Sequence, residues 1–327
     1  MRASSDDASE PPVPSPIFQR GRLPHTWRVS TSALPPKRPL PVSVIVVCSD
    51  SGRSLGDCVQ RALASGVPLE VILIDNASRD GMPQAVERAH AADARLRVIY
   101  NHANLGFGPA VNRAAAQARG DALLVLNPDC LLEGDTVQRL LDVLDAQPQA
   151  GVVGAVVCAA DGTPDPASYR HDPLLWRALA SVFRRRVGGV AVDGGVPAML
   201  VEAEAVSGAL MLLPTKAFRR IGGFDERYFL HCEDLDLCRR MRDAGYPVLL
   251  AGDVRVLHGK GGSSAHRPVF VSRHKHRGMW RWFRTFDPAA RRPLLAGMVW
   301  LGIWAHFAWQ IPGQLWRMKA GDRKRNG

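Results

Sequence analysis

A run of apolar residues from Ala122 to Leu126 ends abruptly on Asn127, Pro128 and Asp129. An apolar run stopped by Asn-Pro is typical of a buried parallel strand at the point where it leaves its sheet. Ligands of open α/β sheets bind beyond the carboxyl ends of such strands. The pattern therefore predicts that Asp129 holds a divalent metal ion and a phosphorylated ligand, although an ordinary turn carboxylate is the simpler interpretation of these residues taken alone.

A second polar cluster, which contains Asp75, Asn76 and Asp80, follows the apolar run Leu69–Ile74. Carboxylates and an amide at the carboxyl end of a strand can accept hydrogen bonds from a nucleobase and a ribose. A turn rich in Asp, Asn and Gly is the alternative interpretation. A calcium-binding EF-hand loop is excluded, because its third position would be Ala77.

Two glycines, Gly106 and Gly108, lie between Asn104 and Asn112. They match the start of the dinucleotide-binding motif G-x-G-x-x-G, but Val111 occupies the position of the third glycine, so the match is weak. The segment predicts a glycine-lined helix start that a ligand can approach closely. A plain tight turn explains the same residues.

The second half of the chain has its own polar groups. Glu233, Asp234 and Asp236 stand at a predicted helix start, after Ser207–Ala209, and His258 ends a later strand. Helix capping and the helix dipole explain acids at such a start. A partly desolvated carboxylate there could also take a proton from an acceptor hydroxyl as general base. His258 is a candidate metal ligand, although an isolated histidine is usually structural.

The elements that must position these residues alternate regularly in the first half. Apolar runs predict strands, and amphipathic stretches predict helices; the strands are Val42–Cys48, Leu69–Ile74, Leu96–Tyr100 and 122–127, and the helices are Leu55–Ala64, Met82–Ala92, Gly108–Arg119 and Asp135–Ala146. This alternation predicts βαβ units and a mostly parallel central sheet flanked by helices.

After Gly151 the alternation loosens. We expect strands over Val152–Cys158 and Ala205–Leu213, and helices over Thr215–Ile221 and Glu233–Ala244. The predicted organisation is one α/β domain over residues 41–286, with a nucleotide-binding half (41–150) and an acceptor-binding half (151–286). Residues 1–40 are rich in Pro, Ser and acids, resemble no secretory signal, and are expected to be disordered or loosely attached.

The six cysteines form no C-x-x-C pair, and several stand in apolar contexts. This usage is typical of reduced structural thiols in the cytosol. The net charge of +11 belongs to the C-terminal segment, because 13 Lys and Arg residues follow from Arg267 onward against only Asp287 and Asp322.

The same segment contains 18 positions without formal charge, Leu294–Ile311 with His306 neutral, and cations on both sides. Apolar residues with several Trp and flanking cations suit a membrane interface. As a helix the segment would be roughly 27 Å long, against a hydrocarbon core of about 30 Å. A membrane-docked helix, a buried packing helix and a true span remain open. Nucleic acid is not an expected partner, because the first 266 residues are neutral and the basic tail is rich in Trp.

Taken together and in order, these motifs resemble the family-2 glycosyltransferases of the GT-A fold, over roughly Pro41 to Phe286 and most closely in the bacterial rhamnosyltransferase-like branch. The resemblance implies a nucleotide-diphospho-sugar transferase fold, followed here by a membrane-associating helical extension over 287–327. It also implies an inverting transfer of a sugar from a nucleoside diphosphate to a hydroxyl, with Mg²⁺ or Mn²⁺ as cofactor.

Carried over residue by residue, Asn127–Asp129 stands where the family has its D-x-D motif, so that Asp129 and the later His258 would hold the metal. Glu233 and Asp234 match the catalytic acid pair, with Asp234 expected to be the base. The residues expected to bind the donor are Asp50, Asp75, Asn76, Asp80, Asn104, Gly106, Asn112, Asn127, Ser207, Gly208 and Ala209. One departure is Cys48-Ser49-Asp50 in place of the family's Thr-Tyr-Asn, which leaves the preferred nucleobase open.

The resemblance also sets the expected partners. The donor would be dTDP-rhamnose or a UDP-hexose, and the acceptor a lipid-linked sugar or a polysaccharide of the cell envelope. We expect a cytoplasmic enzyme, peripheral to the inner face of the membrane. A sugar nucleotidyltransferase is the alternative, but Ser51-Gly-Arg53-Ser54 is a poor version of the glycine-rich loop that it needs. A basic-tailed nucleic-acid-binding module is a third hypothesis.

Overall fold

The computed structural model describes residues 42–183, 195–259 and 267–325, of which 181–183 and 317–325 are described by their backbone alone. All of these residues belong to one compact unit, Arg38–Gly327. The N-terminal segment 1–40, which we expected to be disordered, lies outside the described residues, as does most of the loop after His258.

The first half of the chain forms the alternating units that the sequence predicts. Strands and helices follow one another in the order β1 (Val42–Cys48), α1 (Ser54–Leu63), β2 (Leu69–Asp75), α2 (Met82–Ala89), β3 (Leu96–Tyr100), α3 (Phe107–Ala115), β4 (Ala122–Leu126), β5 (Cys130–Leu131) and α4 (Thr136–Ala146). Every residue of β1, β2 and β4 is buried, as expected for strands covered on both faces.

The second half is less regular. Its elements are β6 (Val152–Cys158), η1 (Pro166–Ser168), β7 (Tyr169–Arg170), α5 (Leu175–Phe183), β8 (Leu200–Glu202), β9 (Ala205–Val206), β10 (Leu210–Pro214), α6 (Thr215–Arg220), α7 (Glu233–Asp243), β11 (Val248–His258), α8 (Pro268–Phe286), η2 (Pro288–Arg291) and α9 (Pro293–Arg325). The strand predicted over Ala205–Leu213 is interrupted at residues 207–209, which separate β9 from β10.

The main sheet has the strand order β3-β2-β1-β4-β10-β6-β11-β5, and β8 pairs with β11. The strands β3, β2, β1 and β4 are parallel, whereas β10 runs antiparallel to both β4 and β6. Leu210, the first residue of β10, lies opposite Leu126, the last residue of β4, so the chain enters β10 where β4 leaves the sheet. The prediction of a mostly parallel sheet therefore holds for the first half, and the second half is mixed.

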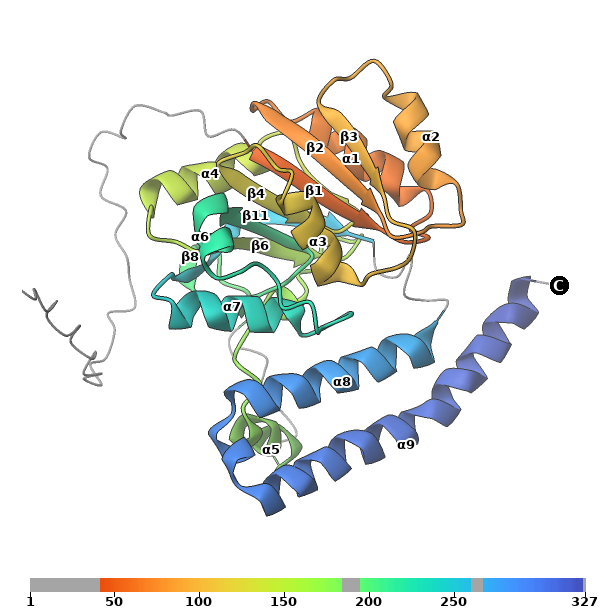
Figure 1. Ribbon diagram of the computed structural model, residues 1–327, viewed down its shortest axis with the longest axis vertical. Helices are drawn as coiled ribbons and strands as arrows, with labels where there is room; N and C mark the ends of the chain where they lie inside the picture. Colours follow the sequence, from red (N-terminus) through yellow and green to blue (C-terminus); the bar gives the residue numbers. More distant parts are fainter. Residues whose placement is uncertain (1–41, 184–194, 260–266, 326–327) are drawn as a thin grey trace, which may run out of the picture. The chain divides into compact units, whose positions relative to one another are not determined.

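Helices cover both faces of the sheet (Figure 1). Val44 and Val46 of β1 face the core under α1, α2 and α4, and Ile45 and Val47 face the core that includes α3, α6 and α7. This alternation follows from the two-residue period of a strand. Both faces of the parallel strands are therefore covered, and polar side chains stand beyond their carboxyl ends.

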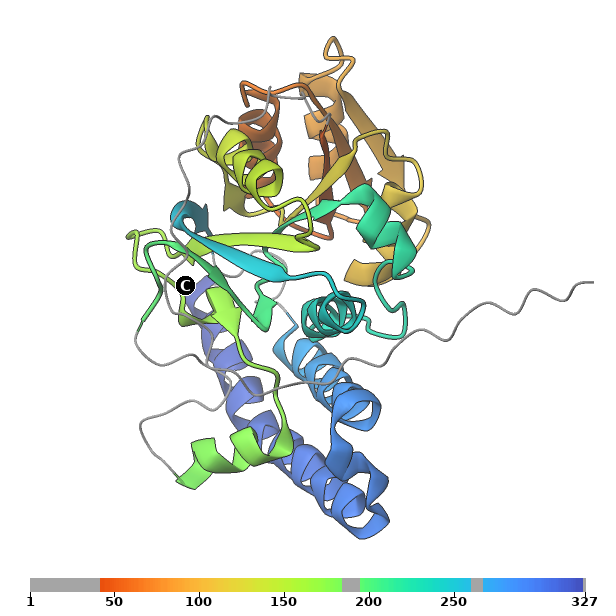
Figure 2. The same ribbon diagram turned by 90° about the vertical axis from the view of Figure 1, so that its left-hand side faces the viewer.

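The C-terminal helices α8 and α9 pack side by side (Figure 2). Their contact is partly polar: His276 Nε2 lies 3.1 Å from His306 Nδ1, and Ser272 donates to Gln310 at 3.2 Å. Almost none of the stretch Pro293–Trp316 is buried, so the interpretation of this segment as a buried packing helix is wrong. The helix is also longer than the 18 uncharged positions, since it continues through Pro312 to Arg325.

Candidate active site

A cavity of about 390 Å³ opens at the carboxyl ends of β1 and β4. Segments from both halves of the chain line it, namely 47–51, 106–107, 127–129, 207–209, 229–231 and 233–234, together with isolated residues such as Asn104. It brings together twelve of the residues that the sequence proposed: Asp50, Asn76, Asn104, Gly106, Asn127, Asp129, Ser207, Gly208, Ala209, Glu233, Asp234 and His258.

One corner of the pocket is suited to a divalent cation. His258 Nε2, at the end of β11, lies 3.0 Å from Asp129 Oδ1, and Asn127 Nδ2 lies 3.4 Å from the same ring nitrogen. Pairing of β11 with β5 places His258 opposite Cys130, which brings the ring to the Asp129 turn. One carboxylate and one imidazole, open to a phosphorylated ligand, are an acceptable donor set for Mg²⁺ or Mn²⁺.

Cys130 is close enough to Asp129 and His258 to complete a group of three possible ligands. Its thiol, however, donates to the carbonyl oxygen of Ala209 at 3.4 Å. Burial raises the pKa of this thiol well above its usual value, so it stays protonated. Cys130 therefore supports this corner through its hydrogen bond, and Asp129 and His258 are the two members of the group that line the pocket.

The two acids at the start of α7 have different surroundings. Arg170 donates to Asp234 Oδ2, as does the backbone N–H of Gly208 at 3.1 Å. The side chain of Glu233 is buried, and its Oε2 atom has no hydrogen-bond partner in the described part of the chain. Burial and, next, the charge of Asp234 raise the pKa of Glu233 well above its usual range.

The backbone before this pair is strained. His231 and Cys232 both have left-handed conformations, with φ of 67° and 68°, although neither is glycine. Such conformations cost free energy and occur where the surrounding structure requires them. Here they turn the chain into α7 so that Glu233 and Asp234 reach the pocket. Burial lowers the pKa of His231, which favours its neutral form at the pocket wall.

The turns that line the pocket after β1, β2 and β3 hold one another by hydrogen bonds. Asn76 Nδ2 donates to the carbonyl oxygen of Gly106 at 2.9 Å, and Asn104 Nδ2 donates to Ser49 Oγ at 3.0 Å. Gly106 has φ of +93°, and a Cβ atom at this position would lie 2.6 Å from the carbonyl oxygen of Phe229. The glycine is therefore required by close packing of two pocket loops, in addition to any ligand contact.

Three residues that we expected to bind the donor do not line the pocket. Asp75 is buried and accepts from the Ser78 N–H at 2.9 Å. Asp80 accepts from the Gly52 N–H at 2.9 Å, which joins the turns after β1 and β2.

Asn112, the third of these residues, also lies outside the pocket lining. It exchanges two hydrogen bonds, both of 2.9 Å, with the backbone N–H and C=O of Phe224. In this structure Asp75, Asp80 and Asn112 therefore shape the loops around the pocket, because turn backbone groups take up their polar atoms.

Several pocket residues were not found from the sequence: Arg170, Phe229, His231, Arg267 and Phe270. Arg170 lies in a two-residue strand within the irregular segment after β6, where no periodicity marks it. Phe229 and Phe270 pack edge to face with ring centroids 5.5 Å apart, and they join the loop before α7 to the start of α8. For Phe229 and His231 the sequence offered one signal, the aromatic stretch that follows Gly222 and Gly223 and precedes Glu233.

Comparison with known proteins identifies sequences that are similar to this chain. Residues 43–199 match the family model described as glycosyl transferase family 2. The chain is 34% identical over 251 residues to the N-acetylglucosaminyl-diphospho-decaprenol L-rhamnosyltransferase of Mycobacterium tuberculosis, covering 67% of this chain and 80% of that protein. It is 24% identical over 208 residues to rhamnosyltransferase WbbL of Escherichia coli, covering 54% of this chain and 77% of that protein.

A similar fold occurs in a solved structure of mannosyltransferase PcManGT from Pyrobaculum calidifontis, in complex with GDP-Man and Mn²⁺. The TM-score is 0.56 with 22% sequence identity, and the match covers 90% of this chain and 78% of that one. At this identity the likeness concerns the fold.

Proposed function

The chain belongs to glycosyl transferase family 2, in its rhamnosyltransferase-like branch, and from this we propose that it transfers rhamnose from a nucleoside diphosphate to a hydroxyl of a lipid-linked acceptor. It is a glycosyltransferase with a GT-A fold. The observation that carries the proposal is one cavity containing both the Asp129–His258 pair and the Glu233–Asp234 pair. Transfer requires the donor diphosphate and the acceptor hydroxyl to be held together in this way.

The relatives support the proposed substrates. The name of the mycobacterial relative specifies an L-rhamnosyl donor group and a diphospho-decaprenol-linked N-acetylglucosamine acceptor, and the relative from Escherichia coli is also a rhamnosyltransferase. We propose dTDP-rhamnose as donor and a lipid diphosphate-linked sugar as acceptor in cell-envelope glycan synthesis. A UDP-hexose donor and a polysaccharide acceptor are the competing possibilities. The family membership replaces the sugar nucleotidyltransferase and nucleic-acid-binding alternatives.

Metal dependence is part of the proposal. Asp129 and His258 would hold Mg²⁺ or Mn²⁺, and a solved structure of similar fold contains Mn²⁺ with its nucleotide sugar. A bound cation would neutralise the negative charge that develops on the departing diphosphate. Asn127 would help to orient His258, since its amide lies 3.4 Å from the ring nitrogen.

The chain's own groups account for the remaining chemistry. We propose that Asp234 takes the proton of the acceptor hydroxyl. The hydroxyl oxygen then forms a bond to the anomeric carbon while the bond from that carbon to the diphosphate oxygen breaks, and the electron pair leaves with the diphosphate. Attack on the face opposite the leaving group inverts the anomeric configuration. Ser207, Gly208 and Ala209 would line the donor sugar, since the carbonyl oxygen of Ala209 accepts from the Asn127 N–H at 2.9 Å and the Gly208 N–H donates to Asp234 at 3.1 Å.

We further propose that 41–286 is the catalytic domain and that 287–327 forms a tail docked on the inner face of the membrane. One helix segment, Pro293–Trp316, is long and apolar enough to cross a bilayer by length and composition. Its exposed residues Leu294, Met298, Leu301, Trp309 and Trp316 follow helical spacing and share one face. The opposite face carries the polar contacts to α8. Trp300 and Leu315 are exposed outside that face as well, and exposed apolar side chains with cations on both sides of the segment support docking at the membrane interface.

A panel of donors tests the proposed function. The protein should be stabilised against thermal unfolding by dTDP-rhamnose together with Mn²⁺ or Mg²⁺, and much less by UDP-glucose or by either component alone. The same dTDP-rhamnose should give inverted product with a prenyl-diphosphate-linked N-acetylglucosamine. Transfer from a UDP-hexose alone would assign another donor, and no transfer from any sugar nucleotide would refute the proposal.

A further inference from the structure

Arg170 and Asp234 meet in the pocket although 64 residues separate them. Arg170 Nη2 and the Gly208 N–H both donate to Asp234 Oδ2. Among the described residues, Asp234 Oδ1 accepts only from the Leu235 N–H, at 2.8 Å. Each carboxylate oxygen has two lone pairs, so Oδ1 keeps one for a substrate hydroxyl.

The two groups that hold Oδ2 come from one small sheet. β7 pairs with β9 in antiparallel register, with Arg170 opposite Ala205, and β9 runs directly into Ser207 and Gly208. The Ser207 N–H also donates to the carbonyl oxygen of Ser168 at 2.9 Å. Arg170 and Gly208 therefore reach Asp234 as a unit.

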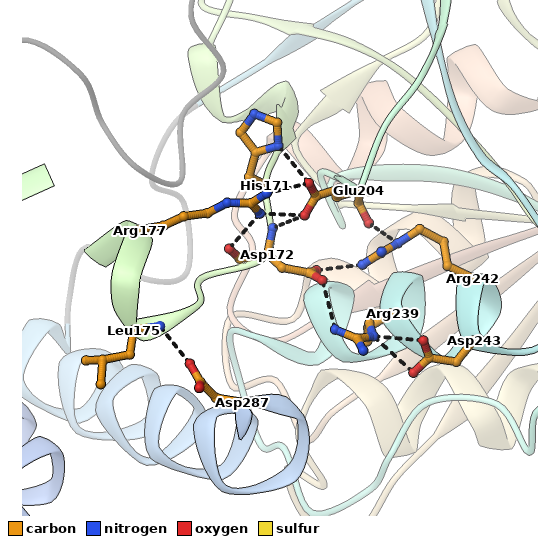
Figure 3. A network of polar contacts seen from close by, with 9 residues as sticks. All are labelled: His171, Asp172, Leu175, Arg177, Glu204, Arg239, Arg242, Asp243 and Asp287. Carbon is orange, nitrogen blue, oxygen red and sulfur yellow. Dashed lines mark hydrogen bonds and ion pairs between the residues drawn. The ribbon is translucent and has the colours of Figure 1, made fainter. Parts of the chain in front are cut away.

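A partly buried ionic cluster fastens this sheet to α7, the helix that begins with Glu233 and Asp234 (Figure 3). Asp172, two residues after Arg170, is 3% exposed and accepts from Arg239 at 3.1 Å and from Arg242 at 2.6 Å. Both arginines belong to α7, the helix that begins at Glu233. The strand with Arg170 and the helix with Asp234 are thus tied at a second point, away from their own ion pair.

Glu204 completes the cluster just before β9 (Figure 3). It accepts from Arg177 at 2.6 and 2.8 Å and from the Asp172 N–H at 2.8 Å, and its carbonyl oxygen accepts from Arg242 at 2.9 Å. Charge-assisted hydrogen bonds of this kind are short and directional. Contacts that do not involve Asp234 therefore set the position of Arg170.

The charge of Arg170 matters as well as its place. Glu233, the residue before Asp234, also lines the pocket. Two adjacent carboxylates disfavour each other's ionisation. An arginine stays protonated at every pH at which the protein is folded. Arg170 therefore places a fixed positive charge against Asp234 Oδ2.

We propose that Arg170 is a positioning residue: it holds Asp234 Oδ2 so that the free lone pair of Oδ1 is presented to the acceptor hydroxyl, and Asp172 holds Arg170 in place. This inference rests on the proposed function, because it assigns a role in sugar transfer. A displacement of the base by about 1 Å can lower a rate by about a hundredfold. The donor, held at the other groups of the pocket, should bind as before.

The test compares Arg170→Met, Arg170→Lys and the control Arg95→Met in the full chain. Arg95 pairs with Asp93 on the surface and does not line the pocket, so its variant should keep the wild-type rate. We expect Arg170→Met to lower kcat about a hundredfold with donor KM within about threefold of wild type. Arg170→Lys should recover part of kcat, because an ammonium can still donate to Oδ2. If Arg170→Met fails to fold, Arg170→Lys is measured instead. A lowered kcat with an unchanged donor KM in that variant would support the proposal.

A double variant separates positioning from independent action. If Arg170 acts through the base, Arg170→Met combined with Asp234→Asn should be no slower than Asp234→Asn alone. An unchanged kcat in Arg170→Met, a loss that lies in donor KM, or losses that multiply in the double variant would overturn the inference. No transfer by the wild-type protein would refute the proposed function and this role with it, whereas normal transfer by Arg170→Met refutes this role alone.

Discussion

Glu233 and Asp234 are neighbours in the chain and line the same pocket, but their carboxyl groups have opposite surroundings. Asp234 has Arg170 at its side, whereas Glu233 is buried and its Oε2 atom has no partner among the described residues. Asp234 therefore lies beside a positive charge, whereas burial raises the pKa of Glu233 and favours its neutral form. This difference separates their proposed roles.

Asp234→Asn removes the proposed base and keeps its size. Transfer should fall by about 10²- to 10⁴-fold, the usual contribution of a general base. Binding of the nucleotide sugar and metal, measured by calorimetry, should survive. Asp142→Asn is the matched control, since Asp142 lies on the exposed side of α4 and does not line the pocket. Equal loss of transfer and donor binding would show that Asp234 does not act as the base.

Glu233→Gln should change how stability depends on pH. Burial raises the pKa of Glu233 in the folded state above the ordinary value of 4.5. The unfolded chain therefore releases this proton more readily, so the stability contributed by the neutral form is complete below pH 4.5 and is lost as pH rises through the folded-state pKa. Glutamine cannot ionise. The free energy of unfolding of Glu233→Gln, measured in urea, should gain on wild type between about pH 5 and about pH 8. A constant difference over that range would contradict the burial effect.

Asp129→Asn tests the metal corner. The wild-type protein should be stabilised by a nucleoside diphosphate only when Mn²⁺ or Mg²⁺ is present, by about 2.7 kcal/mol at a hundredfold excess over Kd. The variant should lose most of this effect, since asparagine offers a neutral ligand to the cation. Asp142→Asn, on the exposed side of α4, serves as control. Equal metal-dependent stabilisation in Asp129→Asn and wild type would remove Asp129 from the site.

The apolar face of α9 should bind anionic vesicles. Leu294 and Trp309 are 86% and 79% exposed, and Arg291 and Arg292 stand at the start of the helix. Met298→Ser with Leu301→Ser should weaken sedimentation with phosphatidylglycerol vesicles by about tenfold or more, because each side chain loses apolar burial of about 1.5 kcal/mol or above. Added salt should weaken it further.

Leu105→Ser provides a matched control for this experiment, because Leu105 is an exposed leucine in the loop between β3 and α3, outside α9. It should leave vesicle binding unchanged. Deletion of residues 291–327 should abolish binding. Undiminished binding after that deletion would place the membrane contact elsewhere in the chain.

Much of the fold could be predicted because its information is local. The apolar runs Val42–Cys48 and Leu69–Ile74, with amphipathic stretches between, specify parallel strands and crossover helices through residues that are close in sequence. The carboxyl ends of such strands meet at one edge of the sheet. Asp129 was therefore placed at the correct edge from its position after an apolar run.

Contacts across long separations could not be predicted in the same way. Asn112 stands in a segment whose glycines indicated a ligand, but packing places it against Phe224, 112 residues later. The backbone N–H and C=O of Phe224 pair with the side-chain amide of Asn112, and nothing in the sequence indicates this pairing. The direction of β10 was also undetermined. A strand's orientation depends on the end of the neighbouring strand at which the chain enters the sheet, and here the chain enters beside the carboxyl end of β4.

The sequence by itself determined the alternating α/β framework, the family and the polar groups at the strand ends, since each depends on short-range patterns. Only the tertiary structure decided how these groups are paired. It brought His258 to Asp129 and Arg170 to Asp234, and it buried Glu233 beside them. Strand register and helix packing set these distances, and the charge state of a carboxyl group depends on what then surrounds it.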